Sequence, residues 1–208
     1  MELAELGDAI RQRFEDKTSA RERGLSSSRA AIRSCGNAIR AMHRYEPERA
    51  EQLLGEAKAA LDEARTVLEP HPELLHAGFV HDAEKEYAEA RITYSLVTDK
   101  GFPTPDELSL SVAAFMKGMA ESIGEIRRHI LDLMRRGELK RCEELLGSMD
   151  EMYYLLVSMD YPDGITLGLR RLTDVARSII ERTRGDFTTS SIQSALRDAL
   201  EQKTSKER

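Results

Sequence analysis

The sequence predicts an all-α protein, a single domain of long antiparallel helices. Charged residues make up 33% of the 208 residues, and Ala, Leu, Glu and Arg recur throughout, which is typical of helices. The chain has no tryptophan and only five phenylalanines, which argues against an all-β domain. No stretch competes as a strand with the helical spacing of the apolar residues. We therefore expect seven helices over residues 1–201 and a charged, frayed tail over 202–208.

The N-terminal half predicts three helices separated by prolines. The first runs from Glu2 to the break at Pro47 and is expected to bend near Gly24, where a run of serines weakens the apolar pattern. Pro47 opens the second helix, because the missing N–H of proline costs nothing in a first turn. Its apolar stripe ends at Leu68, before Pro70. The third helix is expected over about residues 73–98.

The C-terminal half predicts four more helices. Residues 100–105 form a loop, and Thr104 with Glu107 makes a capping box for a fourth helix that extends to about Arg136. Gly137 then ends that helix in a left-handed conformation. Further helices are expected over residues 139–158, about 166–184 and 188–200, with a turn at 160–164 and a break at Gly185.

Charge and cysteine content restrict the possible functions. The net charge of −6 differs from that of a generic nucleic-acid binder, so nucleic acid would need a local, enclosed positive surface. No apolar run approaches the roughly 20 residues that cross a bilayer, so we expect no membrane partner. Cys35 and Cys142 lie far apart without metal-ligand spacing and predict free thiols in a reducing cytoplasm.

Four carboxylates on two predicted helices form the main candidate site. Glu86 and Glu89 are three residues apart on the third helix, and Glu121 and Glu125 are four apart on the fourth. These spacings place each pair on one helix face, where like charges repel. Carboxylate oxygens suit Mg²⁺ or Mn²⁺, which would activate water and stabilise the charge on a scissile phosphate. The pairs therefore suggest a metal site for phosphodiester hydrolysis.

Other interpretations of these carboxylates stay open. Most glutamate pairs on helices are solvated surface, and this chain has many glutamates. A ferritin-like oxidase would need two Glu-x-x-His motifs, but only Glu73 and His76 match, at a helix start. The fourth helix carries small residues on the face of its glutamates, which would let a second backbone or a ligand approach closely: Ala114 and Gly118.

A stripe of arginines is the second candidate site. Four of them fall within about 60° on a helical wheel of the first helix, with no acid between them. Such a stripe on an acidic protein could bind phosphate groups, although pairing with glutamates of a neighbouring helix is an equal alternative. More positive charge lies on the fourth helix next to the carboxylates. The candidate nucleic-acid ligands are Arg29, Arg33, Arg40, Arg44, Arg127 and Arg128, with Arg135 and Arg136 further along.

Three motifs together resemble the translin superfamily, most closely subunits of the translin-associated factor X (Trax) type. Their order and spacing fit from about Arg21 to Asp186. The most specific is the Gly-x-Ala-x-x-x-Gly-Glu pattern of the fourth helix. The motifs are IRAMHR at 39–44, EYAEA at 86–90 and FMKGMAESIGEIRR at 115–128.

The resemblance implies a seven-helix translin-like fold that assembles into closed homo-oligomeric shells, octamers, around single-stranded RNA or DNA. Trax-type subunits are Mg²⁺-dependent endoribonucleases, whereas translin-type subunits mainly bind. The family's acids carry over onto Glu86, Glu89, Glu121 and Glu125 as metal ligands and catalytic residues. The match departs at Glu121, where active subunits usually carry aspartate, and this departure puts the metal geometry in doubt.

Three hypotheses follow from the sequence. The first is an oligomeric endoribonuclease specific for single strands, in which the four glutamates hold Mg²⁺ or Mn²⁺ and the arginines hold the strand. The second is a translin-like protein that binds single strands with steep salt dependence and cleaves nothing. The third is a helical scaffold whose acids are surface residues.

Overall fold

The computed structural model describes residues 2–206, and it is all-helical over that range, which confirms the predicted fold class. Six long helices and three single-turn helices make up the described chain, where seven helices were expected. None of the described helices is long and apolar enough to span a bilayer. The long helices are α1 (Leu3–His43), α2 (Pro47–Leu68), α4 (Gly78–Val97), α6 (Val112–Arg136), α7 (Leu139–Ser158) and α9 (Leu169–Lys206); the short ones are α3 (Pro72–Leu75), α5 (Pro105–Leu108) and α8 (Asp163–Thr166).

Two of the expected helices are interrupted. The third divides into α3 and α4, because the chain leaves the helical conformation at His76 and Ala77. The fourth divides at Ser109, whose φ of 56° is left-handed. The predicted capping box of Thr104 and Glu107 is present, but it caps only the single turn of α5. The side chain of Ser111 caps α6 instead, by accepting from the N–H of Ala114.

Two other expected breaks are absent. α1 runs without interruption through Gly24, which packs so closely on α2 that an added Cβ would lie 2.7 Å from Leu68. The expected sixth and seventh helices form one helix, α9, because Gly185 continues in the helical conformation. α9 also continues to Lys206, through most of the tail expected to fray, and residues 207–208 lie outside the described range. The predicted left-handed end of α6 at Gly137 is confirmed, with φ 79°.

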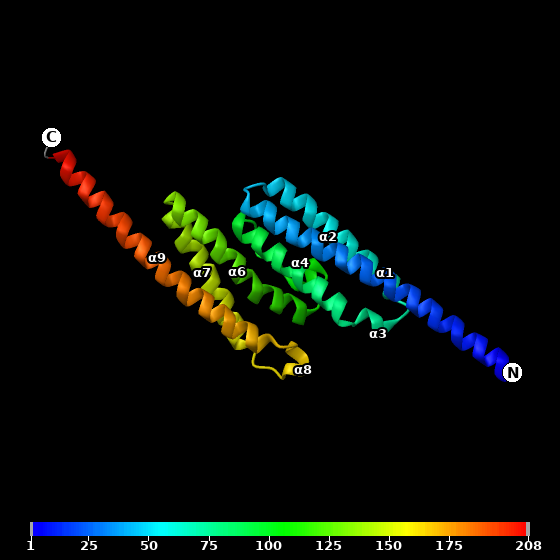
Figure 1. Ribbon diagram of the computed structural model, residues 1–208. Coiled ribbons are helices and arrows are strands. Elements are labelled where there is room, and N and C mark those ends of the chain that lie inside the picture. Colours follow the sequence, from blue (N-terminus) through cyan, green and yellow to red (C-terminus); the bar gives the residue numbers. More distant parts are fainter. Residues whose placement is uncertain (1, 207–208) are drawn as a thin grey trace.

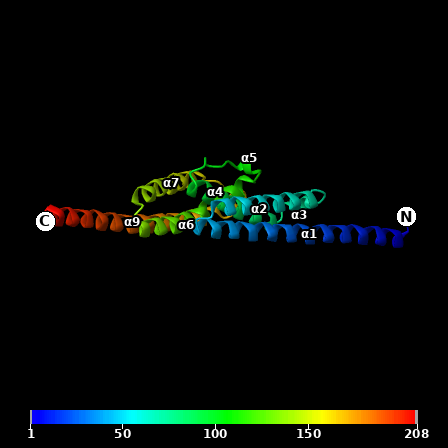
Figure 2. The ribbon, with the colours of Figure 1, turned by 90° about the horizontal axis from the view of Figure 1, so that it is seen from above.

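The long helices form two groups of three (Figure 1). α1, α2 and α4 contact one another, and α6, α7 and α9 contact one another. The contact between α4 and α6 is the main connection between the groups. Figures 1 and 2 show the first part of α1 and the last part of α9 extending beyond the bundle at opposite ends.

The predicted apolar stripes largely coincide with the core. The whole α2 stripe is buried, including Leu54 and Leu61, and so is most of the α6 stripe from Phe115 to Leu133. Val112 is an exception at 65% exposure, because it stands at the first turn of α6. Each protruding helix end carries exposed apolar side chains at helical spacing: Leu3, Leu6, Ile10 and Phe14 on α1, and Ile192, Leu196 and Leu200 on α9.

Gly118 allows the close crossing of α4 and α6. A Cβ added at this buried residue would lie 2.6 Å from both the Cβ of Ala88 and the backbone oxygen of Lys85, and 2.8 Å from the backbone nitrogen of Glu89. Two of these three atoms belong to the α4 backbone, which cannot move without displacing a whole turn. The small residue predicted from the sequence therefore lets the α6 backbone lie directly against α4.

Substitution of Gly118 by alanine should destabilise the protein by about 1–3 kcal/mol, because the methyl group overpacks the helix crossing. Gly55→Ala is the matched control, since the Cβ position of that α2 glycine meets nothing within 4 Å. The control should be stabilising by about 0.5–1 kcal/mol through helix propensity alone. Urea unfolding followed by circular dichroism measures both. Equal effects of the two substitutions would contradict the tight crossing.

Candidate metal and nucleic-acid site

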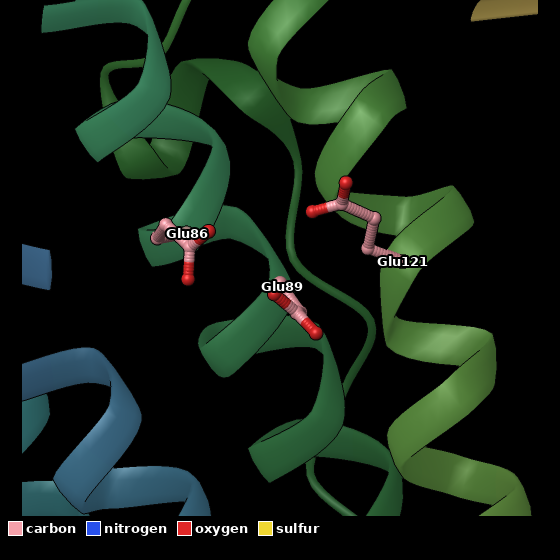
Figure 3. Close-up of side chains that lie close together, drawn as sticks. All are labelled: Glu86, Glu89 and Glu121. Carbon is pink, nitrogen blue, oxygen red and sulfur yellow. The ribbon is translucent and has the colours of Figure 1, made fainter. Parts of the chain in front are cut away.

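Three carboxylates converge where α4 and α6 cross. Glu86 and Glu89 project from α4, and Glu121 projects toward them from α6 (Figure 3). One ligand oxygen from each lies within 4.8 Å of the others. The three side chains are partly buried, so the cluster sits at the edge of the helix interface rather than in free solvent. The sequence predicted these residues as one site, and the structure places them together. We call Glu86, Glu89 and Glu121 the carboxylate trio.

Glu125, the fourth predicted ligand, lies beside the trio but has a different partner. Its Oε2 is 2.6 Å from Nε2 of His43 at the end of α1. This hydrogen bond lowers the pKa of Glu125 against the opposing effect of burial, and the charges of His43 and Arg128 act in the same direction. The negative charge of Glu125 also raises the pKa of Glu89, after burial, Glu86 and Glu121. The role of Glu125 as a metal ligand stays a prediction.

Lys85 supplies the positive charge within the cluster. Its ammonium nitrogen lies 3.1 Å from Oε1 of Glu86 and 2.5 Å from Oε2 of Glu121. Only 15% of its side chain is exposed. Burial lowers the pKa of Lys85, but the hydrogen bonds to Glu121 and Glu86 outweigh burial and hold the pKa above its ordinary value. Lys85 is therefore a charged bridge between α4 and α6.

Glu89 has no cationic partner among the described residues, and it keeps its proton to a higher pH than an ordinary glutamate. Burial raises the pKa of Glu89 to about 8, and the negative charges of Glu86, Glu121 and Glu125 add to the shift. The same field reaches α1, where burial first and then Glu86 and Glu89 raise the pKa of the Cys35 thiol. The buried Cys35 is free, as predicted, and stays protonated. The cluster thus has more negative charge than its own lysine offsets.

The donor set fits a divalent cation. Hard cations such as Mg²⁺ and Mn²⁺ prefer carboxylate oxygens, and the trio offers three of them within a short distance of one another. A cation among them would also favour the charged form of Glu89, whose pKa is raised first by burial and then by its negative neighbours. Glu121 is one methylene longer than the aspartate expected from the resemblance, and its carboxylate oxygen still lies within 4.8 Å of those of Glu86 and Glu89.

The arginines of α1 lie on an exposed strip of that helix, beside the helix face that carries His43. All four are exposed, and no described acidic group lies within ion-pair distance of any of them. Arg40 hydrogen bonds only to Asn37, at 2.6 Å. Taking about 100° per residue, His43 lies about 40° around α1 from Arg29, so the strip adjoins the helix face that contacts Glu125. We call Arg29, Arg33, Arg40 and Arg44 the arginine strip.

The two arginines predicted on α6 differ from each other. Arg128 is exposed and close enough to Glu125 to lower the pKa of that carboxyl. Arg127 is instead held against α9, where its guanidinium donates to the hydroxyl of Thr183 at 3.0 Å and to Asp186 at 2.8 Å. Arg127 therefore connects two helices, while Arg128 keeps its charge beside the site.

Sequence reasoning missed two residues of the site, Lys85 and His43. Lys85 lies on α4 directly before Glu86, but its partner Glu121 lies 36 positions away. In the sequence, His43 was singled out only as part of the IRAMHR motif, and its partner Glu125 lies 82 positions away. The small residues Ala114 and Gly118 gave the one available signal for these contacts, because they indicated that another helix backbone would pass close to Glu121.

Comparison with known proteins places this chain in a family. No protein-family model matches the chain. The uncharacterized protein MJ0175 of Methanocaldococcus jannaschii is 30% identical over 187 residues, which cover 89% of this chain and 82% of that protein. The structure "AfC3PO - duplex RNA complex" is 30% identical with a TM-score of 0.83, and the match covers 89% of this chain and 96% of that one. The chain belongs to the translin/C3PO family.

Further C3PO structures agree with this assignment. A second structure, the crystal structure of AfC3PO, gives the same identity and TM-score. The crystal structure of apo-NeC3PO is only 17% identical, yet its TM-score is 0.81 over 91% of this chain, which shows the shared fold. The resemblance to the translin superfamily found in the sequence is thereby confirmed at the level of the family.

In the absence of divalent ions, the stability of the protein should fall as pH rises from about 4.5 to about 8. The folded state raises the pKa of Glu89 from 4.5 to about 8, so it holds a proton that the unfolded state has lost. The stabilising contribution is full below pH 4.5 and is lost as pH passes through 8. Glu89→Gln should make this decline shallower, measured by urea unfolding in chelator at several pH values.

Glu63→Gln, at an exposed position of α2, serves as the control for this pH experiment. It should leave the decline unchanged. If Glu89→Gln also leaves the decline unchanged, Glu89 is not the carboxyl that carries the raised pKa.

Proposed function

We propose that this protein is a metal-dependent endoribonuclease of the C3PO family that acts on RNA within a closed homo-oligomeric shell. The observation that carries the proposal is the convergence of the carboxylate trio at the α4–α6 crossing. The family supports RNA as the substrate class, since AfC3PO, which is 30% identical, has a structure described as a complex with duplex RNA. The Trax-type assignment from the sequence and an octameric shell are parts of this proposal.

Glu86, Glu89 and Glu121 are the proposed ligands of Mg²⁺ or Mn²⁺, with Glu125 as a further ligand. The bound ion would supply Lewis-acid activation of water and charge stabilisation at the scissile phosphate. The protein's own part is to fix the oxygens: Gly118 sets the distance between the two helices, and His43 orients the carboxylate of Glu125. Deprotonated Glu89 is the form that accepts the ion.

The arginine strip and Arg128 are the proposed contacts to the RNA backbone. All five guanidinium groups are exposed, Arg128 lies close to Glu125, and guanidinium groups bind phosphate oxygens in a bidentate manner. This local positive surface explains how a chain of net charge −6 binds a polyanion. We propose single-stranded RNA as the substrate, and single-stranded DNA as a further ligand, because flexible strands enter an enclosed space most easily. Contacts of this kind carry little sequence information.

The second candidate function is binding of RNA without cleavage. One observation favours it, since the ammonium group of Lys85 pairs with two of the three trio carboxylates, Glu86 and Glu121. A site whose ligands are held by lysine in this way would bind RNA through the arginine strip and lack hydrolysis.

Cleavage of fluorescently labelled RNA distinguishes the two functions. With Mg²⁺ or Mn²⁺, the wild-type protein should cut single-stranded RNA, and Glu89→Gln should reduce the rate at least about 100-fold because a metal ligand is lost. Glu63→Gln is the matched control and should cut at the wild-type rate. A short duplex RNA tested in parallel shows which form is preferred. Cleavage that persists in chelator would contradict the metal mechanism, and binding without cleavage in every divalent ion would establish the second function.

The salt dependence of RNA binding tests the arginine strip. Arg33→Gln should weaken binding of a single-stranded RNA and reduce the slope of log K against log salt by about 0.7 for the lost phosphate contact. Arg177→Gln is the control, because this exposed arginine of α9 already bonds to Glu181 at 2.9 Å. Fluorescence anisotropy titrations between low and physiological salt measure both variants. A change of equal size in the control would mean that the strip has no special role.

A further inference from the structure

We infer that Lys85 is a built-in counter-cation that occupies the trio in place of a divalent ion and sets the affinity of the site for that ion. The inference rests on the proposed function, because it assumes that the trio binds a metal. It assigns a role to a residue that does not itself coordinate the ion. Lys85 would hold the empty site together and would have to be displaced each time the ion enters.

The position of the ammonium group carries the inference. It lies 3.1 Å from Glu86 and 2.5 Å from Glu121, so it bridges a carboxylate of α4 and a carboxylate of α6. Both are members of the trio, whose ligand oxygens lie within 4.8 Å of one another. The ammonium group thus holds two of the three carboxylates that a divalent ion would need, all except Glu89.

The backbone of Lys85 is held in this position by the helix crossing. The Cβ position of Gly118 is only 2.6 Å from the backbone oxygen of Lys85, so the α6 backbone lies directly against this turn of α4. The side chain then runs along the interface, with 15% of it exposed. The two ion pairs are therefore partly shielded from solvent, which makes each of them stronger than a surface pair.

No second cation shares this role in the described part of the chain. Every ion pair of Glu86 and Glu121 there is made with Lys85. Without Lys85, three carboxylates would face one another with no compensating charge. Lys85 therefore stabilises the protein without metal, and the same two ion pairs oppose the entry of a metal.

The binding free energy of a divalent ion is smaller at a site whose carboxylates are already paired with a cation. To coordinate Glu86 and Glu121 it must break both lysine pairs, and the freed ammonium group must find another position. Replacing Lys85 with a neutral residue of similar length removes this competition while keeping the packing of the side-chain stem. The affinity for the ion should then rise even though the protein without ion becomes less stable.

Titration of the chelator-treated protein with Mn²⁺ tests the inference, with free Mn²⁺ followed by electron paramagnetic resonance. Lys85→Met should bind Mn²⁺ at least about tenfold more tightly than wild type, since two partly shielded ion pairs no longer compete. Lys85→Arg keeps the charge and should stay close to wild type. Lys85→Gln repeats the test in a more polar form in case the methionine variant folds poorly.

Thermal unfolding provides an independent measurement. In chelator, Lys85→Met should unfold at a lower temperature than wild type, because the trio loses its counter-cation. With saturating Mn²⁺ its unfolding temperature should rise by more than that of wild type. Both changes have the same cause, so a purely structural role of Lys85 would produce the first without the second.

Glu89→Gln, made in the wild-type and Lys85→Met backgrounds, separates the inference from the proposed function. If Mn²⁺ binding depends on Glu89 but Lys85→Met binds no more tightly than wild type, the lysine inference is wrong and the metal site stands. If Mn²⁺ binding survives Glu89→Gln in both backgrounds, or no variant binds Mn²⁺, the metal site is wrong and the inference fails with it. Tighter binding in Lys85→Met that is lost with Glu89→Gln supports both.

Discussion

The close approach of α6 to α4 at Gly118 is the constraint on which the rest of the structure depends. α4 and α6 form the main connection between the two three-helix groups, so their spacing sets how the groups meet. The same spacing brings Glu121 within reach of Glu86 and Glu89. A side chain at residue 118 would separate the backbones, and the architecture and the carboxylate trio would change together. One glycine thus links the packing of the fold to the chemistry of the site.

Bringing three carboxylates together with Glu125 beside them creates an electrostatic conflict that the protein resolves in three ways. Lys85 bridges two of the carboxylates, and Glu89 keeps its proton, with a pKa raised to about 8 by burial and by its neighbours. Glu125 is turned to His43 on a third helix. Each arrangement reduces the net negative charge of the site, and a bound divalent ion would reduce it further. The exposed arginines of α1 lie outside this network and form no ion pair with a described acidic group.

Much of the fold followed from the sequence, because apolar spacing and prolines are local signals. The Leu54–Leu61 stripe, the proline start of α2 and the glycine end of α6 were all predicted. The break at Ser109 and the continuity of α9 through Gly185 were not predicted. A left-handed serine has no strong signal in the sequence, and one glycine inside a helix costs only about 1 kcal/mol. For the site, the resemblance identified which glutamates belong together. Lys85 and His43 were not predicted as site residues. Their partners Glu121 and Glu125 are distant in sequence, and only the packing of the helices brings them into contact.

The central claim is that the α4–α6 crossing holds three carboxylates at a spacing suited to one divalent ion. A crystal structure of the wild-type protein soaked in Mn²⁺, with data collected near the manganese absorption edge, tests it most directly. We expect an anomalous peak within coordination distance of Glu86, Glu89 and Glu121, with the ammonium group of Lys85 displaced from Glu86 and Glu121. A structure with no peak at this position at saturating Mn²⁺, and with Lys85 still paired to Glu86 and Glu121, would contradict it.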